Sequence, residues 1–129
     1  AEQFLKLVKE GWYNDVGVFR VVPGFVSQFG LPAQPKPELS PIQDDKVLTS
    51  NKRGTLTFAT AGKNARTSQL FVNLADNQGL DGQGFSPFVE LIDDGMKVVD
   101  AFYSSYGQRP SQSLIKSQGN KDLDANFPK

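Results

Sequence analysis

The stretch from Val18 to Gly30, with the sequence VFRVVPGFVSQFG, constrains the fold of this chain more than any other. Its apolar residues predict strands over Gly17–Val22 and Phe25–Phe29, and Pro23-Gly24 between them is typical of a tight turn. Arg20 lies inside the first strand, although arginine is always charged and is almost never buried without a partner. We therefore expect Arg20 either to pair with a carboxylate or to face a pocket where a ligand contacts its guanidinium.

The composition narrows the chemistry that such a pocket can perform. The 129 residues include no cysteine and no histidine, which excludes disulfides, thiolate nucleophiles, zinc–thiolate sites and imidazole acid–base catalysis. A formal net charge of zero gives no electrostatic reason to expect binding to nucleic acid or to a membrane. No apolar run approaches the ~20 residues that span a bilayer, so we expect a soluble protein, of unknown compartment. Ten phenylalanines either fill the core or line a surface pocket.

The rest of the chain predicts three more strands and two helices. The strands are predicted over Gly54–Thr60, Gln69–Leu74 and Phe85–Leu91, and the last of them carries Pro87, as is typical of an edge strand or a bulge. The helices are predicted over Ala1–Glu10, ended by Gly11, and over residues 93–107. Their buried stripes are predicted to be Phe4, Leu5, Leu7 and Val8 in the first and Val98, Val99 and Phe102 in the second.

The segments 31–53 and 108–129 are predicted to be loops, because proline and polar residues interrupt any periodic pattern there. Short strands joined by turns favour an antiparallel sheet or barrel. We therefore predict one mostly-β domain over residues 1–129. Two pairs of adjacent carboxylates, Asp44-Asp45 and Asp93-Asp94, are better explained by a solvated turn and by helix capping than by a metal site or by facing acid–base carboxylates.

Four blocks, in this order, resemble the cyclophilins, the peptidyl-prolyl cis–trans isomerases of the cyclophilin type. The blocks are FRVVPGFVSQFG, GTLTFATAGKNARTSQLFVNL, GLDGQGFSPFVEL and GMKVV, and together they extend over nearly the whole chain. The resemblance implies an eight-stranded antiparallel β-barrel capped by two α-helices, with a proline-binding groove on its outer face. It also implies a monomeric isomerase that acts on Xaa-Pro bonds in peptides and folding proteins and needs no metal or cofactor.

The resemblance also implies the residues of the site. Arg20 matches the family's catalytic arginine. The positions that match the family's substrate-binding residues are Phe25, Val26, Gln28, Ala59, Thr60, Gln69, Phe71, Leu80 and Phe88. Among these, Gln28 and Gln69 resemble the amides that contact the substrate backbone and orient the arginine, and Phe88 resembles the aromatic floor of the pocket.

The residues fit this chemistry. Rotation about a prolyl bond has a barrier of ~18–20 kcal/mol, and no bond is broken, so neither a nucleophile nor a metal is needed. As the amide twists, its nitrogen gains a lone pair, and a hydrogen bond from Arg20 would be stronger in the twisted state than in the planar one. The alternative function is a chaperone or scaffold module that binds proline-containing peptides with little turnover. The presence of Arg20 favours the enzyme.

The chain also departs from the family pattern. Phe19 replaces a histidine, Thr60 an asparagine, and Leu70 a second aromatic residue. Gly79 stands where many members have a tryptophan, which predicts weakened cyclosporin binding because the indole N–H is a donor to that drug. A histidine of the family is also missing near Gly84. The family's first hairpin and last strand have no counterpart here, so we expect a fragment truncated at both ends, with one side of the barrel open.

Overall fold

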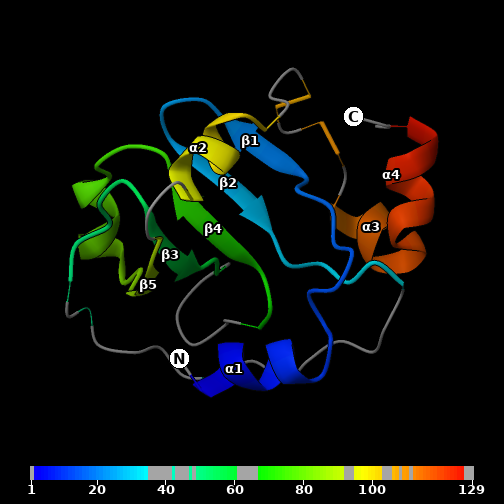
Figure 1. The fold of residues 1–129 in the computed structure, drawn as a ribbon, viewed down its shortest axis with the longest axis horizontal. Coiled ribbons are helices and arrows are strands. Elements are labelled where there is room, and N and C mark those ends of the chain that lie inside the picture. The colour runs from blue at the N-terminus through cyan, green and yellow to red at the C-terminus, as the bar shows by residue number, and fades with distance from the viewer. Residues whose placement is uncertain are drawn as a thin grey trace.

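The computed structural model describes residues 2–34, 42, 47, 49–60, 67–91, 95–102, 106–107, 109–110 and 112–126. Its centre is a five-stranded sheet in the order β1-β2-β4-β3-β5, and every neighbouring pair is antiparallel (Figure 1). The strands are β1 (Arg20–Val22), β2 (Val26–Phe29), β3 (Thr55–Phe58), β4 (Leu70–Asn73) and β5 (Pro87–Glu90). The sheet is not closed, because β1 and β5 form its two edges.

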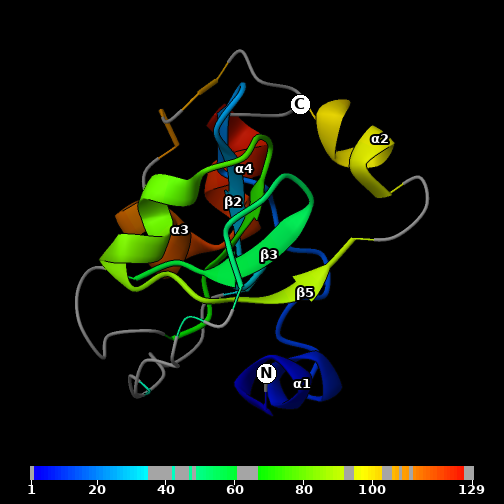
Figure 2. The same ribbon diagram turned by 90° about the vertical axis from the view of Figure 1, so that its left-hand side faces the viewer.

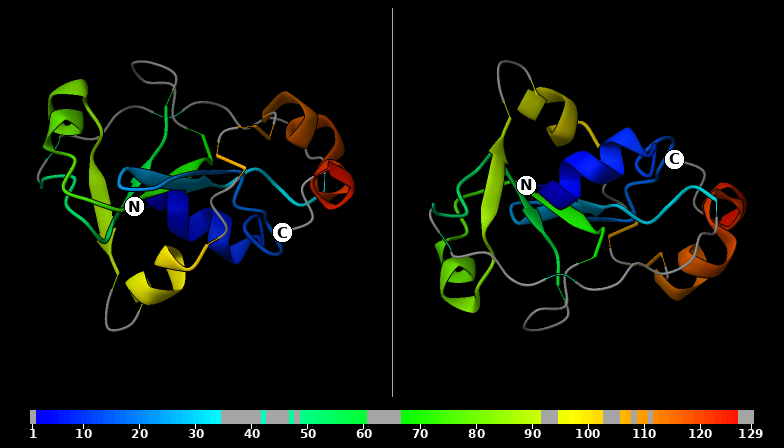
Figure 3. Two further views of the ribbon diagram at one scale, coloured as in Figure 1. Left: turned by 90° about the horizontal axis from the view of Figure 1, so that it is seen from above. Right: turned by 90° about the horizontal axis from the view of Figure 1, so that it is seen from below.

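Helices lie beside one side of this sheet and at two ends of the molecule (Figure 3). They are α1 (Glu2–Lys9), the short 3-10 helix η1 (Gln78–Gln83), α2 (Gly95–Asp100), α3 (Gln112–Gln118) and α4 (Asn120–Asn126). Figure 3 shows α1 and α2 on the same side of the sheet, with η1 at one end of the molecule and α3 and α4 at the other. Figure 2 shows α1 and α2 at separate positions along that side.

Each of the five predicted strands is confirmed, at a shorter length. The predicted Pro-Gly turn is also confirmed, since the Phe25 N–H donates to the Val22 carbonyl at 3.0 Å. Pro87 begins an edge strand whose register with β3 shifts between Leu56 and Thr57, as expected for a proline at an edge or bulge.

The first helix ends at Gly11 as predicted. The Gly11 N–H donates to the Val8 carbonyl at 3.1 Å, and the Trp12 N–H donates to the Leu7 carbonyl at 3.0 Å. This pattern needs a left-handed residue, and Gly11 has a φ of 76°. Glycine supplies that conformation without steric cost.

The prediction of a loop over residues 108–129 is wrong, because this segment contains α3 and α4. Each helix has only seven residues, and among the side chains that the structure describes there, Ile115 in α3 and Leu123 in α4 are the buried ones. So few apolar positions leave no measurable helical period in the sequence. The second predicted helix is also shorter than expected, since α2 ends at Asp100.

The main core lies between the sheet and the helices α1 and α2. Its buried residues are Leu56, Phe58, Leu70, Val72 and Val99. Three aromatic or apolar residues of the helical side pack against this cluster: Phe4 of α1, Met96 of α2, and Phe102, which follows α2. We call this side of the sheet the core face.

The predicted helical stripes are partly wrong. Leu7 and Val99 are buried, but Leu5, Val8 and Val98 are exposed by 55%, 47% and 64%. A helix of two turns contacts the sheet along one narrow line only, so the flanking apolar residues of α1 and α2 remain in solvent.

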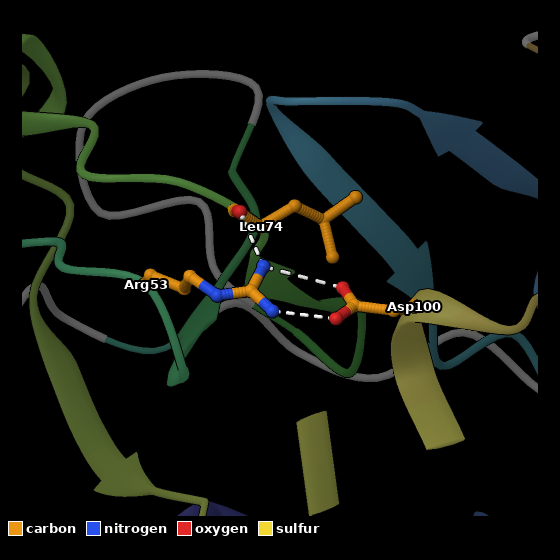
Figure 4. A network of polar contacts seen from close by, with 3 residues as sticks. All are labelled: Arg53, Leu74 and Asp100. Atoms are coloured by element: carbon orange, nitrogen blue, oxygen red, sulfur yellow. Dashed lines mark hydrogen bonds and ion pairs between the residues drawn. The ribbon is translucent and has the colours of Figure 1, made fainter. Parts of the chain in front are cut away.

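An ion pair fastens α2 to the sheet (Figure 4). Both terminal nitrogens of Arg53 donate to the carboxylate of Asp100, and its Nη1 also donates to the Leu74 carbonyl at 2.7 Å. The Arg53 backbone N–H donates to Asp76 at 3.0 Å. The residues of this contact are exposed, so bulk water weakens it.

The two carboxylate pairs considered above, Asp44-Asp45 and Asp93-Asp94, lie outside the described residues. Within the described ranges, histidine, cysteine, aspartate and glutamate form no group of three or more that is able to hold a metal ion. None of the helices found in those ranges has the length and apolar character needed to cross a membrane.

Candidate functional site

The strand register brings Arg20 into one row of residues across the sheet. Arg20 pairs with Gln28, Gln28 with Phe71, Phe71 with Thr57, and Thr57 with Pro87. Directly paired residues on neighbouring strands point to the same face of a sheet. The row therefore lies on the face opposite the core face, and we call it the Arg20 face.

Hydrogen bonds join the polar members of this face. Arg20 Nη1 donates to Gln28 Oε1 at 3.2 Å, and Gln28 Nε2 donates to Gln69 Oε1 at 2.8 Å. The amide oxygen of Gln28 accepts a hydrogen bond from Arg20, and its nitrogen donates one to Gln69, so both ends of this amide are fixed. The backbone carbonyl of Gln69 accepts the Ala59 N–H at 2.9 Å, which places the end of β3 beside the same network.

One partner of Arg20 is thus a neutral amide, that of Gln28. Gln28 is 7% exposed, whereas Arg20 is partly exposed. The carbon at the centre of the guanidinium also lies 5.8 Å from the centroid of the Phe25 ring, within the range of a cation–π contact. Gln28 on one side and Phe25 on the other orient the charged group at the sheet surface.

Apolar side chains flank this polar network. Val26 and Phe71 are 2% and 5% exposed and lie on β2 and β4. The ring of Phe85 meets that of Phe71 edge-on, with a centroid distance of 5.6 Å. Phe85 is not among the predicted site residues, because the sequence comparison with the family noted only that a histidine is absent near Gly84. The signal that could have found Phe85 is its position, since it is an aromatic residue directly after Gly84.

Asn51 fixes the position of η1 and of Phe85. It is fully buried, and its Nδ2 donates to Asp81 Oδ1 at 2.7 Å and to the Phe85 carbonyl at 2.9 Å. Its Oδ1 accepts the Thr57 hydroxyl at 2.9 Å, and its backbone carbonyl accepts the Asn77 N–H at 2.7 Å. The side chain and backbone of one residue thus connect the sheet to both ends of the segment that carries η1. We call these contacts the Asn51 network.

Asp81 is the charged member of this network. Its carboxylate accepts the Ser50 hydroxyl at 2.6 Å, together with the side-chain and backbone N–H groups of Asn51. These hydrogen bonds, first that from Ser50 and then those from Asn51, lower the pKa of Asp81 below its ordinary value of 3.8. Asp81 therefore acts as a fixed anion that holds the segment before β3 to η1.

The remaining candidate residues fall into two groups. Ala59 and Thr60, directly after β3, and Leu80, in η1, are partly exposed. Phe88 packs elsewhere, because its ring stacks on Phe58 at 5.0 Å and lies 5.3 Å from Phe4. The structure therefore places Phe88 with the core and not beside Arg20.

This arrangement suits binding more than covalent chemistry. It offers a cationic donor, fixed amides and an apolar aromatic surface side by side on one face of a sheet. Such a surface can hold an apolar ring against Phe71 while Arg20 donates to a polar atom next to that ring.

The profile of the family described as "Cyclophilin type peptidyl-prolyl cis-trans isomerase/CLD" matches residues 1–119. The chain is 35% identical to peptidyl-prolyl cis-trans isomerase B of Escherichia coli over 112 residues, which cover 78% of this chain and 68% of that protein. It is 38% identical to peptidyl-prolyl cis-trans isomerase A of Dickeya dadantii over 110 residues, 78% of this chain and 57% of that protein.

Solved structures share the fold. A cyclophilin-type peptidyl-prolyl cis-trans isomerase of Cryptosporidium parvum superposes with a TM-score of 0.71 at 24% identity, over 83% of this chain and 73% of that one. The same protein in the presence of the dipeptide Ala-Pro gives a TM-score of 0.70, over 86% and 77% of the two chains. The matched region is shorter than the curated relatives, since it spans 57–68% of their lengths.

Proposed function

We propose that this chain accelerates the cis–trans isomerisation of Xaa-Pro peptide bonds, because it belongs to the family of cyclophilin-type peptidyl-prolyl cis-trans isomerases. The observation that carries the proposal is the chain of hydrogen bonds from Arg20 through Gln28 to Gln69, next to the buried ring of Phe71. These residues come from β1, from β2, and from β4 together with the residue directly before it, and the sheet brings them to one face.

The proposed mechanism is non-covalent. The proline ring rests against Phe71 and Val26, with Phe25, Leu80 and Phe85 around it, while Arg20 donates to the prolyl nitrogen. That nitrogen becomes a better acceptor as the amide twists, so the hydrogen bond stabilises the transition state more than the planar ground state. An acceleration of ~10⁵-fold corresponds to roughly 7 kcal/mol of such differential stabilisation.

The proposed substrates are Xaa-Pro segments of peptides and of folding proteins. The peptide backbone lies along Ala59 and Thr60 and meets the amides of Gln28 and Gln69. A monomer suffices for this reaction, because a single chain supplies every residue of the proposed site. Phe88 is omitted from the substrate contacts, since it packs with Phe58.

Cyclosporin binding is proposed to be weak. Gly79 lies exposed in η1 and supplies no N–H from a side chain at the position where an indole is common. The isomerase reaction does not use that donor, so it should be unaffected by its absence.

The experiment compares exchange rates of a Xaa-Pro peptide, measured by NMR, for the parent chain and for Arg20→Ala. We expect the parent to accelerate exchange and the variant to lose about 100-fold in kcat/KM, the typical effect of removing one transition-state donor. Arg53→Ala is the matched control, because it deletes the same groups at a distance from the Arg20 face. It should retain the parent rate at a temperature where circular dichroism shows that it is folded.

Two results would contradict the proposal. Equal rates for the parent and Arg20→Ala would remove the catalytic role of the arginine. Peptide binding by the parent without any acceleration of exchange would instead support the chaperone or scaffold module.

A further inference from the structure

We propose that helices α3 and α4 position the catalytic arginine by holding Phe19, the residue that precedes Arg20. This inference rests on the proposed isomerase function, and it assigns a task to the part of the chain that sequence reasoning predicted to be a loop. Phe19 and Ile115 are its positioning residues, and neither of them contacts substrate.

A second, smaller core carries the argument. Phe19 is 2% exposed and belongs to a buried cluster that contains Leu31, Ile115 of α3 and Leu123 of α4. Phe19 immediately precedes β1 and Leu31 follows the end of β2, so this cluster holds the two strands that supply Arg20 and Gln28. The cluster is separate from the main core, and Figure 1 shows α3 and α4 beyond the end of the sheet.

Backbone contacts fix the helical pair against these strands. The Asn120 N–H donates to the Ala33 carbonyl at 2.7 Å, and its side-chain Nδ2 donates to the Asp15 carbonyl at 2.7 Å. Gly119 permits this approach, because a Cβ atom there would lie 2.1 Å from the Ala33 oxygen and because its φ is 62°. The turn between α3 and α4 therefore touches the segment after β2, and Asn120 also touches the segment before β1.

The position of Phe19 is passed on to Arg20 through the strand. Neighbouring residues of a strand point to opposite faces, so a shift of the Phe19 side chain moves the backbone from which Arg20 extends. The Phe19 N–H donates to the Gln28 carbonyl at 3.1 Å, and the Val21 N–H donates to the Gly107 carbonyl at 3.1 Å. Arg20 thus lies between two residues whose backbones are held in place, Phe19 and Val21, and the cluster with α3 and α4 holds Phe19.

The test uses Ile115→Ala, which opens a cavity beside Phe19, and Leu114→Ala as its matched control on the same helix. Ile115 is 1% exposed, whereas Leu114 is 44% exposed, so the two variants delete similar groups from opposite environments. We expect Ile115→Ala to lower kcat by about tenfold with little change in KM, because a small misplacement of Arg20 affects the twisted state while the proline pocket is intact. Leu114→Ala should keep the parent kcat.

Two further measurements make the test decisive. Ile115→Val deletes one methyl group and should give an intermediate kcat, which decides the matter if Ile115→Ala fails to fold. The NMR signals of the Gln28 side-chain amide, identified by their loss in Gln28→Leu, should shift in the Ile115 variants and not in Leu114→Ala. Unchanged kcat and unchanged Gln28 signals in a folded Ile115 variant would overturn the inference. A parent without isomerase activity would overturn the proposed function instead, and the Gln28 signals would still test the positioning.

Discussion

At the scale of single residues, the contact between Arg20 and the amide of Gln28 matters for the proposed catalysis. A carboxylate would neutralise the guanidinium and would compete with the substrate for its N–H groups. Gln28 takes one N–H of Arg20 without adding negative charge at this contact. The positive charge of Arg20 can then act on the lone pair that develops on a twisting prolyl nitrogen.

Two buried serines differ in whether their hydroxyl has a hydrogen-bond partner, and this predicts that replacement by alanine has opposite effects on their contribution to stability. The Ser27 hydroxyl on β2 has no hydrogen-bond partner among the described residues, whereas the Ser68 hydroxyl donates to the Gly30 carbonyl at 2.8 Å. We expect Ser27→Ala to raise the free energy of unfolding by about 1 kcal/mol, because it removes an unsatisfied buried group. Ser68→Ala should lower it by about 1 kcal/mol. Urea unfolding measures both, and a destabilised Ser27→Ala would show that its hydroxyl has a partner.

Gly79 allows a gain-of-binding prediction. A Cβ atom at this position meets no other atom within 4 Å, and Gly79 lies on the surface of η1. We expect Gly79→Trp to bind cyclosporin about tenfold more tightly than the parent, because it adds an indole N–H donor and an aromatic surface. Isothermal titration calorimetry measures the affinities, with Gly79→Phe as the control that adds the ring without the N–H. Equal affinities of the two variants would exclude the role of the donor.

At the scale of elements, polar side chains decide where η1 lies. Asn51 and Asp81 join η1 to the sheet, and this connection brings Phe85 to Phe71. The sequence around Asn51 and around Asp81 does not predict that they are partners, because their hydrogen bonds join residues 30 positions apart. The Asn51 network is thus a tertiary feature that sequence periodicity does not detect.

The attachment of α2 gives a prediction for one ion pair. We expect Arg53→Ala to unfold at a lower urea concentration than the parent, because it loses the contacts to Asp100 and to the Leu74 carbonyl. Both partners are 45% exposed, so the difference should shrink at high salt. Lys52→Ala, an exposed neighbour, is the control and should match the parent. A midpoint of Arg53→Ala equal to that of the parent at low salt would show that apolar packing against the main core holds α2 without the ion pair.

At the scale of the whole molecule, Asp81 links stability to pH. Its folded-state pKa lies below the ordinary 3.8, so the stability that it contributes is present above that pH and is lost as the pH falls through the folded-state pKa. Asp81→Asn cannot lose a proton and should lack this contribution. We therefore expect the parent to be more stable than Asp81→Asn at neutral pH and the difference to diminish below about pH 3.8.

Urea unfolding at pH 7 and at successively lower pH values measures this difference. Asp124→Asn, at an exposed position on α4, is the matched control and should follow the parent at each pH. A stability difference between the parent and Asp81→Asn that does not change with pH would show that the carboxylate charge is not what holds η1.

The amino-acid sequence by itself determined the strands, the Pro-Gly turn and the end of α1, because each depends on residues close together in the chain. It also determined the resemblance to the cyclophilins, because that rests on the order of four blocks of sequence. It also determined the exclusion of thiol and imidazole chemistry, since those residues are missing. The tertiary structure alone decided that Phe88 joins the core, that Phe85 meets Phe71, and that residues 112–126 form two helices around Ile115 and Leu123. These features arise from contacts between distant residues, whose free energy overrides weak local preferences.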